Sequence, residues 1–225
     1  METSSETPTP PLGRLIQFDE RSREYPVRTL LAAEPKKLQS YTWRCKQVLQ
    51  QGSLGACTGF SWSHELIARP AEVQGITNET AIKVYKLAQD LDEWEGNAYE
   101  GSSVLAAVKA TQQLHPGKIL EYRWSFKLDD FLRTLGYIGP VVIGINWYND
   151  MFNPNNKGLI KVGGGLAGGH AILANGIDVK KKLIRLHNSW GPDWGVNGEC
   201  FISFDDIERL LNERGEACVV TKRKK

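Results

Sequence analysis

The sequence predicts an α+β fold with two lobes and a groove between them. Residues 57–135 are mostly helical in pattern, with apolar residues at the spacing of a helix face. After Gly139-Pro140 the pattern changes to short apolar runs bounded by turn residues, which is typical of strands. A helical half followed by a sheet half favours α+β, and a groove between two lobes is a common place for a ligand.

Four helices are expected before the change of pattern. They are CTGFSWSHELIA, ending before Arg69-Pro70; NETAIKVYKLAQDLDEW, with Asn78 as its N-cap; SSVLAAVKATQQL, opening with a Ser pair; and LDDFLRTLG, ending at Gly136. The expected strands are VVIGI, HAILANGID, KLIRLHNSW, ECFISF and EACVVT, with a short helix at DDIERLLNER. The turn VKKK should join the second and third strands as a hairpin.

The domain boundaries follow from this pattern. We expect a polar, Pro-rich and partly disordered arm over residues 1–35, one folded domain over 36–221 and a solvated basic tail over 222–225. Within the domain, the helical lobe should span about 46–122, and the sheet lobe about 36–45 and 123–221. A chain of 225 residues is long enough for two such lobes.

Composition excludes several classes of function. With 28 basic and 26 acidic residues the net charge is +2, so nucleic acid is not an expected partner. No apolar run is long enough to cross a membrane, and the N-terminus lacks the pattern of a secretory signal. The four cysteines form no CxxC pair and are expected to be reduced. We therefore expect a cytoplasmic protein, and we expect a monomer.

Three stretches combine residue types that carry nucleophilic chemistry. The first, QQGSLGACTGFSW, contains Gln51 and places Cys57 after a glycine-rich turn at an expected helix start. The second, GGHAI, contains His170, and the third, HNSWGPDWGVNG, contains Asn188 and Trp190. A helix N-terminus favours a thiolate, and a Cys, a distant His and an Asn are the parts of a nucleophile, its base and an orienting amide.

These motifs resemble the papain-like cysteine peptidase family, in the bacterial or phage type of member that has no propeptide. The NSWGxxWGxxG signature is complete from Asn188 to Gly198, and the similarity runs from about Tyr41 to about Thr221. The resemblance implies a two-lobed fold with an active-site cleft between a helical lobe and a sheet or barrel lobe. It also implies a thiol-dependent endopeptidase that acts on peptides or proteins through an acyl-enzyme, with no metal and no cofactor.

The resemblance also assigns roles to individual residues. Cys57 would be the nucleophile, His170 its acid and base, Asn188 the residue that orients the imidazole, and Gln51 an oxyanion donor. Trp190 would shelter the His–Asn hydrogen bond from water. The residues expected to contact substrate are Gly101, Ser103, Gly144, Gly169, Ala171 and Trp190. Gly101 would pair with the substrate backbone, while Ser103, Gly144 and Ala171 would wall a neutral pocket for bulky apolar side chains.

The sequence departs from the family pattern in three places. Thr58 stands where the family has Trp, Leu54 stands where it has a disulfide Cys, and about 40 residues before the matching region are few for an inhibitory propeptide. Two alternatives therefore stay open: a non-catalytic, papain-like scaffold that binds peptides or serves a structural role, and acyl transfer to an acceptor other than water.

Other candidate motifs favour simpler interpretations. The glycines of GGGLAGG match GxGxxG, but no strand–turn–helix pattern surrounds them, so they are expected to form a flexible approach to His170. His64 lacks the second His of an HExxH zinc motif. His187 should point to the opposite side of its strand from Asn188, and Cys45, Cys200 and Cys218 are expected to be packing residues.

Overall fold

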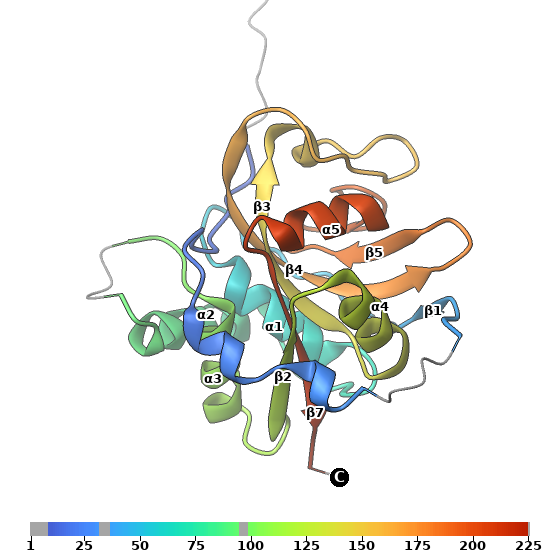
Figure 1. Cartoon of the computed structure of the whole chain (residues 1–225). Coiled ribbons are helices and arrows are strands. Elements are labelled where there is room, and N and C mark those ends of the chain that lie inside the picture. The colour runs from blue at the N-terminus through green and yellow to red at the C-terminus, as the bar shows by residue number, and fades with distance from the viewer. Residues whose placement is uncertain (1–8, 32–36, 95–98, 225) are drawn as a thin grey trace, which may run out of the picture.

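The computed structural model describes residues 9–31, 37–94 and 99–224, and Figure 1 shows their arrangement. The helices are α1 (Cys57–Ile67), α2 (Asn78–Leu91), α3 (Val104–Leu114), α4 (Leu128–Tyr137) and α5 (Phe204–Asn212). Short 3₁₀ turns are η1 (Glu20–Glu24), η2 (Val27–Thr29) and η3 (Asn149–Phe152). The strands are β1 (Tyr41–Thr42), β2 (Glu121–Ser125), β3 (Val141–Tyr148), β4 (Leu166–Asp178), β5 (Leu183–His187), β6 (Glu199–Ser203) and β7 (Glu216–Lys222).

In the described part of the chain, the strands form one seven-stranded sheet. Its order is β2-β7-β3-β4-β5-β6, and β1 pairs with β4. Neighbouring strands are antiparallel throughout. Because β4 is long, one end of it pairs with β3 and the other with β1 and β5. The mixture of helices and an antiparallel sheet confirms the predicted α+β class.

The sheet separates two hydrophobic cores. Alternate residues of β3 and β4 point to opposite faces, as a strand requires. Val142 and Leu173 pack with α1, α2 and α3 in one core, whereas Ile143 and Ile172 pack with α4 and α5 in the other. Figure 1 shows α1, α2 and α3 grouped on one side of the molecule and α4 and α5 on the other. The groove of interest lies where the first group meets the sheet.

The helix starts follow local capping chemistry. Thr77 caps α2: its hydroxyl accepts from the Thr80 N–H, and the Thr80 hydroxyl accepts from the Thr77 N–H. Ser103 and Ser203 cap α3 and α5 by accepting from backbone N–H groups. Asn78, the expected N-cap of α2, is instead its first helical residue. The other expected helices and strands are all present, including the β4–β5 hairpin.

Other features of the fold also differ from the expectations, among them β1, which was not predicted. The strand β2 was not predicted, because its sequence EYRWS alternates poorly and only its last two residues are buried. The basic tail is not simply solvated: Lys222 ends β7, and Arg223 pairs with the buried Glu65 of α1 and donates to the carbonyl oxygen of Lys118. The arm was expected to be partly disordered; its residues 1–8 and 32–35 lie outside the described residues.

Candidate active site

Cys57 is the first residue of α1, directly after the glycine-rich turn. The N-cap residue is Ala56, which makes no side-chain capping bond, so the N–H groups of the first turn can face a developing negative charge. The whole of α1 is buried. Gly59 permits this burial, because a Cβ there would lie 2.3 Å from the carbonyl oxygen of Ala81 in α2. The fold therefore holds a thiol at the N-terminus of a central helix.

His170 of β4 is hydrogen-bonded to Asn188, which follows β5. The distance from His170 Nε2 to Asn188 Oδ1 is 2.8 Å, and the same Oδ1 accepts from the backbone N–H of Ser189 at 2.9 Å. Because this oxygen acts as the acceptor, His170 carries its proton on Nε2. Its Nδ1 has no hydrogen-bond partner among the described residues. The lone pair of Nδ1 is thus available to take a proton.

Two indole rings enclose the imidazole of His170. The Trp190 ring lies 4.7 Å from it at an interplanar angle of 33°, and the Trp147 ring lies 4.8 Å from it at 68°. His170 is completely buried. This burial disfavours the charged imidazolium and lowers the pKa of His170 to about 4, although the bond to Asn188 acts in the opposite direction.

The thiol of Cys57 is also buried and is held by the residue after the histidine. The backbone N–H of Ala171 donates to Cys57 Sγ at 3.2 Å. Burial raises the pKa of Cys57 to about 12, outweighing this bond and the positive charge of Arg14. In this form, burial therefore favours the neutral thiol and the neutral imidazole.

Gln51 is positioned by a residue that the sequence analysis did not single out. Ser189 Oγ donates to Gln51 Oε1 at 2.6 Å, which turns the amide nitrogen the other way. Gln51 Nε2 donates to the carbonyl oxygen of Leu54 at 2.7 Å and, at longer range, to those of Pro11 and Leu12 at 3.3 and 3.4 Å. Ser189 lies inside the NSWG motif, so its position in the sequence could have identified it as a residue of the site. The amide expected to bind an oxyanion thus contacts carbonyl oxygens of the N-terminal arm.

The arm occupies the cleft between the two lobes. The backbone N–H groups of Gly13 and Arg14 both donate to the carbonyl oxygen of Gly169, at 3.3 and 3.0 Å. On the other side, Ser102 N–H donates to Gly13 O at 3.1 Å, and Leu15 N–H donates to Ser102 O at 3.2 Å. Trp190 Nε1 donates to Pro11 O at 3.1 Å. The arm therefore bridges the lobes as an added strand across the buried thiol.

Two glycines allow the backbones to approach this closely. Gly13 has a φ of +146°, and a Cβ on it would lie 2.0 Å from the carbonyl oxygen of Gly55. A Cβ on Gly169 would lie 2.2 Å from the carbonyl oxygen of Arg14. Any side chain at either position would separate the arm from the cleft. Gly169 was predicted to contact substrate, and in this structure it contacts the arm.

The remaining predicted substrate residues surround the same segment. Gly101 lies next to Ser102 and its N–H donates to the Tyr85 hydroxyl at 3.0 Å. Ser103 is the cap of α3 and is buried, and its hydroxyl faces Asp19 at 3.5 Å. Gly144 of β3 lies against the Arg14 side chain, since a Cβ there would be 2.9 Å from Arg14 Nε.

The pocket beside Gly144 is not neutral, which corrects the sequence-based expectation. Glu216, the first residue of β7, pairs with Gly144 in the sheet register and is 1% exposed. Its carboxylate lies 3.4 Å from the Arg14 guanidinium. Glu216 was not predicted from the sequence because it lies far from the motifs. An acidic residue leading the apolar run ACVV was the available signal.

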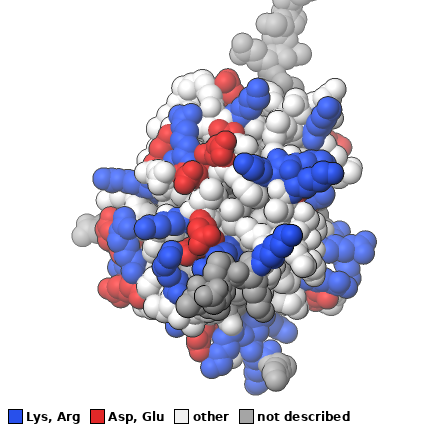
Figure 2. Space-filling model, turned by 45° about the vertical axis from the view of Figure 1, so that its right-hand side comes forward, with Lys and Arg blue, Asp and Glu red and all other residues white. Residues whose placement is uncertain are grey.

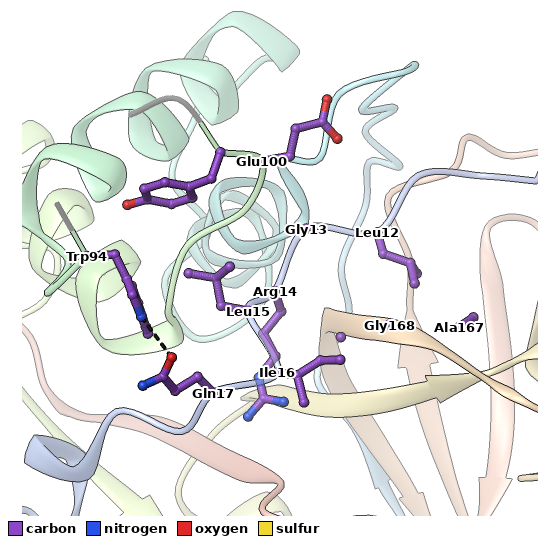
Figure 3. A pocket seen from close by; sticks show the side chains of 12 residues that line it. Leu12, Gly13, Arg14, Leu15, Ile16, Gln17, Trp94, Glu100, Ala167 and Gly168 are labelled. Atoms are coloured by element: carbon purple, nitrogen blue, oxygen red, sulfur yellow. Dashed lines mark hydrogen bonds between the residues drawn. The ribbon is translucent and has the colours of Figure 1, made fainter. Parts of the chain in front are cut away.

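A hollow of about 780 Å³ remains beside the arm on the side of Leu15 to Gln17. Figure 3 shows the arm passing between the helices and β4, with Glu100 at the edge of the hollow. Trp94 Nε1 donates to Gln17 Oε1 at 3.1 Å across it. A second recess, of about 360 Å³, lies at the other end, beside Pro11, Gln50 and Trp190. The groove thus extends to both sides of Cys57.

A second Cys–His cluster lies behind the active-site residues. His187 is hydrogen-bonded through Nδ1 to Glu199 at 3.2 Å and through Nε2 to the carbonyl oxygen of Gln47 at 3.0 Å. The His64 ring packs edge-on against it at 4.5 Å, and Cys45 interacts with it as well. His187 is buried, so it is a packing residue and not a surface one. Cys200 and Cys218 are buried in the two cores, and Thr58 is buried in α1.

Other chemistries find little support in the described residues. Among the described residues, no group of three or more His, Cys, Asp or Glu side chains is arranged so that it could hold a metal ion. The last four residues of the GGGLAGG segment form the start of β4, paired with β3, so they are not the flexible approach that was expected, and no helix follows them. Across residues 9–31, 37–94 and 99–224, no helix combines the length and apolar character needed to cross a bilayer.

The fold and the Cys57, His170 and Asn188 arrangement define a two-lobed protein of the thiol hydrolase type. A sequence model described as "Papain family cysteine protease" matches residues 43–218, so the chain belongs to the papain family of cysteine proteases. The structure of xylellain, a cysteine protease from Xylella fastidiosa, is similar with a TM-score of 0.72 and 19% identity, covering 98% of this chain and 100% of that one.

Two further relatives extend the comparison. Digestive procathepsin L2 proteinase from Tenebrio molitor has a TM-score of 0.62 at 18% identity, covering 97% of this chain and 80% of that chain. Cathepsin B-like cysteine proteinase 6 from Caenorhabditis elegans is 37% identical over 62 residues, which are 27% of this chain and 16% of that protein. The structural matches establish the shared fold, and the matched segment is a small part of the nematode protein.

Proposed function

We propose that this chain is a thiol-dependent endopeptidase that hydrolyses peptide bonds through a Cys57 acyl-enzyme. The observation that carries the proposal is the 2.8 Å bond from Asn188 to His170, together with the contact between Ala171 N–H and Cys57 Sγ. The bond to Asn188 leaves His170 Nδ1 unprotonated. His170 directly precedes Ala171, whose N–H holds the thiol. A nucleophile, a base and an orienting group are thus assembled.

The proposed reaction uses these groups in two steps. His170 Nδ1 takes the thiol proton, and Cys57 Sγ attacks the substrate carbonyl carbon. The backbone N–H of Cys57 and the amide of Gln51 stabilise the oxyanion, as donors fixed in advance of the reaction do. His170 then gives its proton to the leaving amine, which departs as the carbon–nitrogen bond breaks. Water, deprotonated by His170, hydrolyses the thioester and restores the free thiol.

The path of the arm supports cleavage within chains. The described arm residues enter beside Trp190, pass between Gly169 and Ser102 and continue past Gln17. A groove that holds an extended segment on both sides of the nucleophile accommodates a peptide that continues in both directions. This favours an endopeptidase over an enzyme that removes terminal residues.

In the arm-bound form the enzyme is proposed to be latent. The arm covers Cys57, contacts the oxyanion donor Gln51 and keeps the thiol and imidazole neutral by burying them. Catalysis then requires the arm to leave the cleft. The arm is thus proposed to be a control element of the enzyme.

Labelling with an electrophilic peptide probe tests the proposal. The intact protein should react slowly, and protein whose arm has been displaced should be labelled selectively at Cys57 among its four cysteines. Mass spectrometry identifies the labelled residue, and a quenched fluorogenic peptide measures turnover. Labelling that requires denaturation, with no turnover under any condition, would instead identify a non-catalytic scaffold.

The arm supports the alternative of a non-catalytic scaffold, because a cleft that holds the chain's own backbone could also serve a peptide-binding protein. Acyl transfer is distinguished by the product: an added amine acceptor would appear joined to the acyl fragment.

For the setting, we propose a reducing compartment such as the cytoplasm, supported by four cysteines that are all free. Acidic and basic side chains are interspersed on the face shown in Figure 2, which fits a protein substrate better than a polyanion.

A further inference from the structure

Ser102 offers both of its backbone groups to the segment in the cleft. Its N–H donates to Gly13 O at 3.1 Å, and its carbonyl oxygen accepts from the Leu15 N–H at 3.2 Å. Main-chain bonds of this kind hold any extended peptide, whatever its side chains. Gly101, directly before Ser102, has a φ of +107°, and a Cβ on it would lie 2.9 Å from Gly13 O. The orientation of the Ser102 peptide groups therefore decides how well a backbone is held on this side of the cleft.

Asp92 fixes Ser102 through its carboxylate. It directly follows the last residue of α2, and its Oδ2 accepts from the Ser102 hydroxyl at 2.8 Å. Its Oδ1 accepts from the Tyr99 hydroxyl at 2.6 Å and from the Trp94 N–H at 3.2 Å. Hydrogen bonds to a carboxylate are shorter and stronger than those between neutral groups. One side chain thus joins the end of α2 to Tyr99 and to Ser102.

Two other residues of α2 support the same segment. Gln89 Nε2 donates to Tyr99 O at 2.8 Å, and the Tyr85 hydroxyl accepts from the Gly101 N–H at 3.0 Å. Tyr85, Gln89 and Asp92 have the spacing that brings side chains to one face of a helix. This face of α2 therefore positions residues 99–102, and within it Asp92 is the residue that holds the Ser102 side chain.

We infer that Asp92 is a positioning residue for peptide binding: through the Ser102 hydroxyl, it orients the Ser102 N–H and carbonyl groups to pair with an extended backbone in the cleft. The arm is the segment paired with them in this structure, and the inference, which rests on the proposed function, extends that pairing to a substrate. Asp92 acts through Ser102 and not on the reacting atoms. Its loss should therefore raise KM and leave kcat nearly unchanged.

Steady-state kinetics in an open cleft test the inference. The full-length Gly13→Leu variant provides this cleft, because any side chain at Gly13 would separate the arm from it. In this background, Asp92→Ala should raise KM for a fluorogenic peptide about tenfold, as for the loss of one hydrogen bond, and change kcat by less than about twofold. Asp92→Asn keeps one acceptor oxygen and should raise KM about threefold. Asp90→Ala, at an exposed residue of the same helix, is the matched control and should leave KM unchanged. A lower kcat with unchanged KM in Asp92→Ala would overturn the inference.

Thiol alkylation distinguishes positioning from a general loss of structure. With the arm intact, Asp92→Ala should speed the reaction of Cys57 with iodoacetamide about tenfold, because the arm depends on the same Ser102 groups. Cys200 and Cys218 are buried elsewhere and should stay unreactive, as mass spectrometry reports. Equal acceleration at all three thiols would overturn the inference. If Asp92→Ala fails to fold, as judged by circular dichroism, Ser102→Ala removes only the Ser102 bond to Asp92 and should show the same rise in KM.

Binding measurements separate this inference from the peptidase proposal. Fluorescence anisotropy of a labelled peptide on Gly13→Leu/Cys57→Ala protein needs no turnover, and adding Asp92→Ala should weaken its affinity about tenfold. Weaker binding in Asp92→Ala, without cleavage by any variant that retains Cys57, would support the positioning role and overturn the peptidase. Cleavage by the Gly13→Leu variant, with equal affinity whether or not Asp92 is replaced, would overturn the positioning role alone.

Discussion

Two Cys–His clusters of the described residues have buried histidines on the neighbouring strands β4 and β5, and they differ in the third partner. In the active site, His170 is bonded to the neutral amide of Asn188, and burial lowers its pKa to about 4. In the rear cluster, burial opposes the charge on His187, but the neighbouring Cys45 sulfur and the hydrogen bond to Glu199 outweigh it and raise its pKa to about 10. His170 has only a neutral amide to offset its burial, whereas Cys45 and the Glu199 carboxylate together favour the cationic form of His187. Under the proposed function, the first cluster serves catalysis and the second serves structure.

Replacing the thiol of each cluster in turn by alanine gives the largest expected difference in activity. Cys57→Ala should lower kcat/KM by about 10⁴-fold or more, because the nucleophile is removed. Cys45→Ala is the matched control and should stay within about threefold of the starting protein. Both are measured after the arm has been displaced, with a fluorogenic peptide. A comparable loss in Cys45→Ala would remove the distinction between the clusters.

Changing the partner of His170 sharpens the comparison. Asn188→Ala should lower kcat by about 100-fold, because an imidazole that is no longer oriented is misplaced for proton transfer. Asn188→Asp should make the first cluster resemble the second, raising the pKa of His170 as Glu199 does for His187. The pH–kcat profile reports this as a shift to more alkaline pH. An unshifted profile in Asn188→Asp would show that the neutral amide is not what sets the imidazole's pKa.

The rear cluster should affect stability and its pH dependence. The pKa of His187 is raised in the folded state, so its contribution is fully present below about pH 6.5 and is lost as the pH rises through about 10. Glu199→Gln should lower the free energy of unfolding by about 2 kcal/mol at pH 6 and by less at pH 10.5. Urea denaturation at the two pH values measures this. An equal loss at both would mean that the charge on His187 contributes little.

The smallest effect is expected from loosening the arm. Arg14→Ala removes one buried ion pair while keeping the backbone contacts to Gly169 and Ser102, so the arm should still bind. Alkylation of Cys57 by iodoacetamide at pH 7 should become about tenfold faster, because the covered state is weakened by a little more than 1 kcal/mol. Arg23→Ala, at an exposed ion pair, is the control. Equal rates in both variants would show that Arg14 does not hold the arm in place.

The sequence predicted what local patterns encode. The periodicity of its apolar residues predicted α2, although its cap is Thr77 and not Asn78. Short motifs drew attention to Cys57, His170 and Asn188. The arm and Glu216 could not be found in this way. Residues 9–16 have no periodicity, and their order comes from contacts with Gly169 and Ser102, which are distant in sequence. Glu216 lies in the cleft because β7 pairs with β3, and this pairing of strands distant in sequence cannot be recognised from the motifs.

The attachment of the arm has a consequence for how the cleft can be opened. Behind Arg14, the buried residues Phe18, Asp19, Ser22 and Val27 fix the following segment to the body of the protein. The arm is thus a ligand on a short tether, and a tethered ligand experiences a high local concentration that dilution of the protein does not change. Opening should therefore be independent of protein concentration, and a free peptide copy of residues 9–19 should bind far more weakly than the arm itself. Only cutting the tether, or a substrate present in large excess, would shift the balance towards the open cleft.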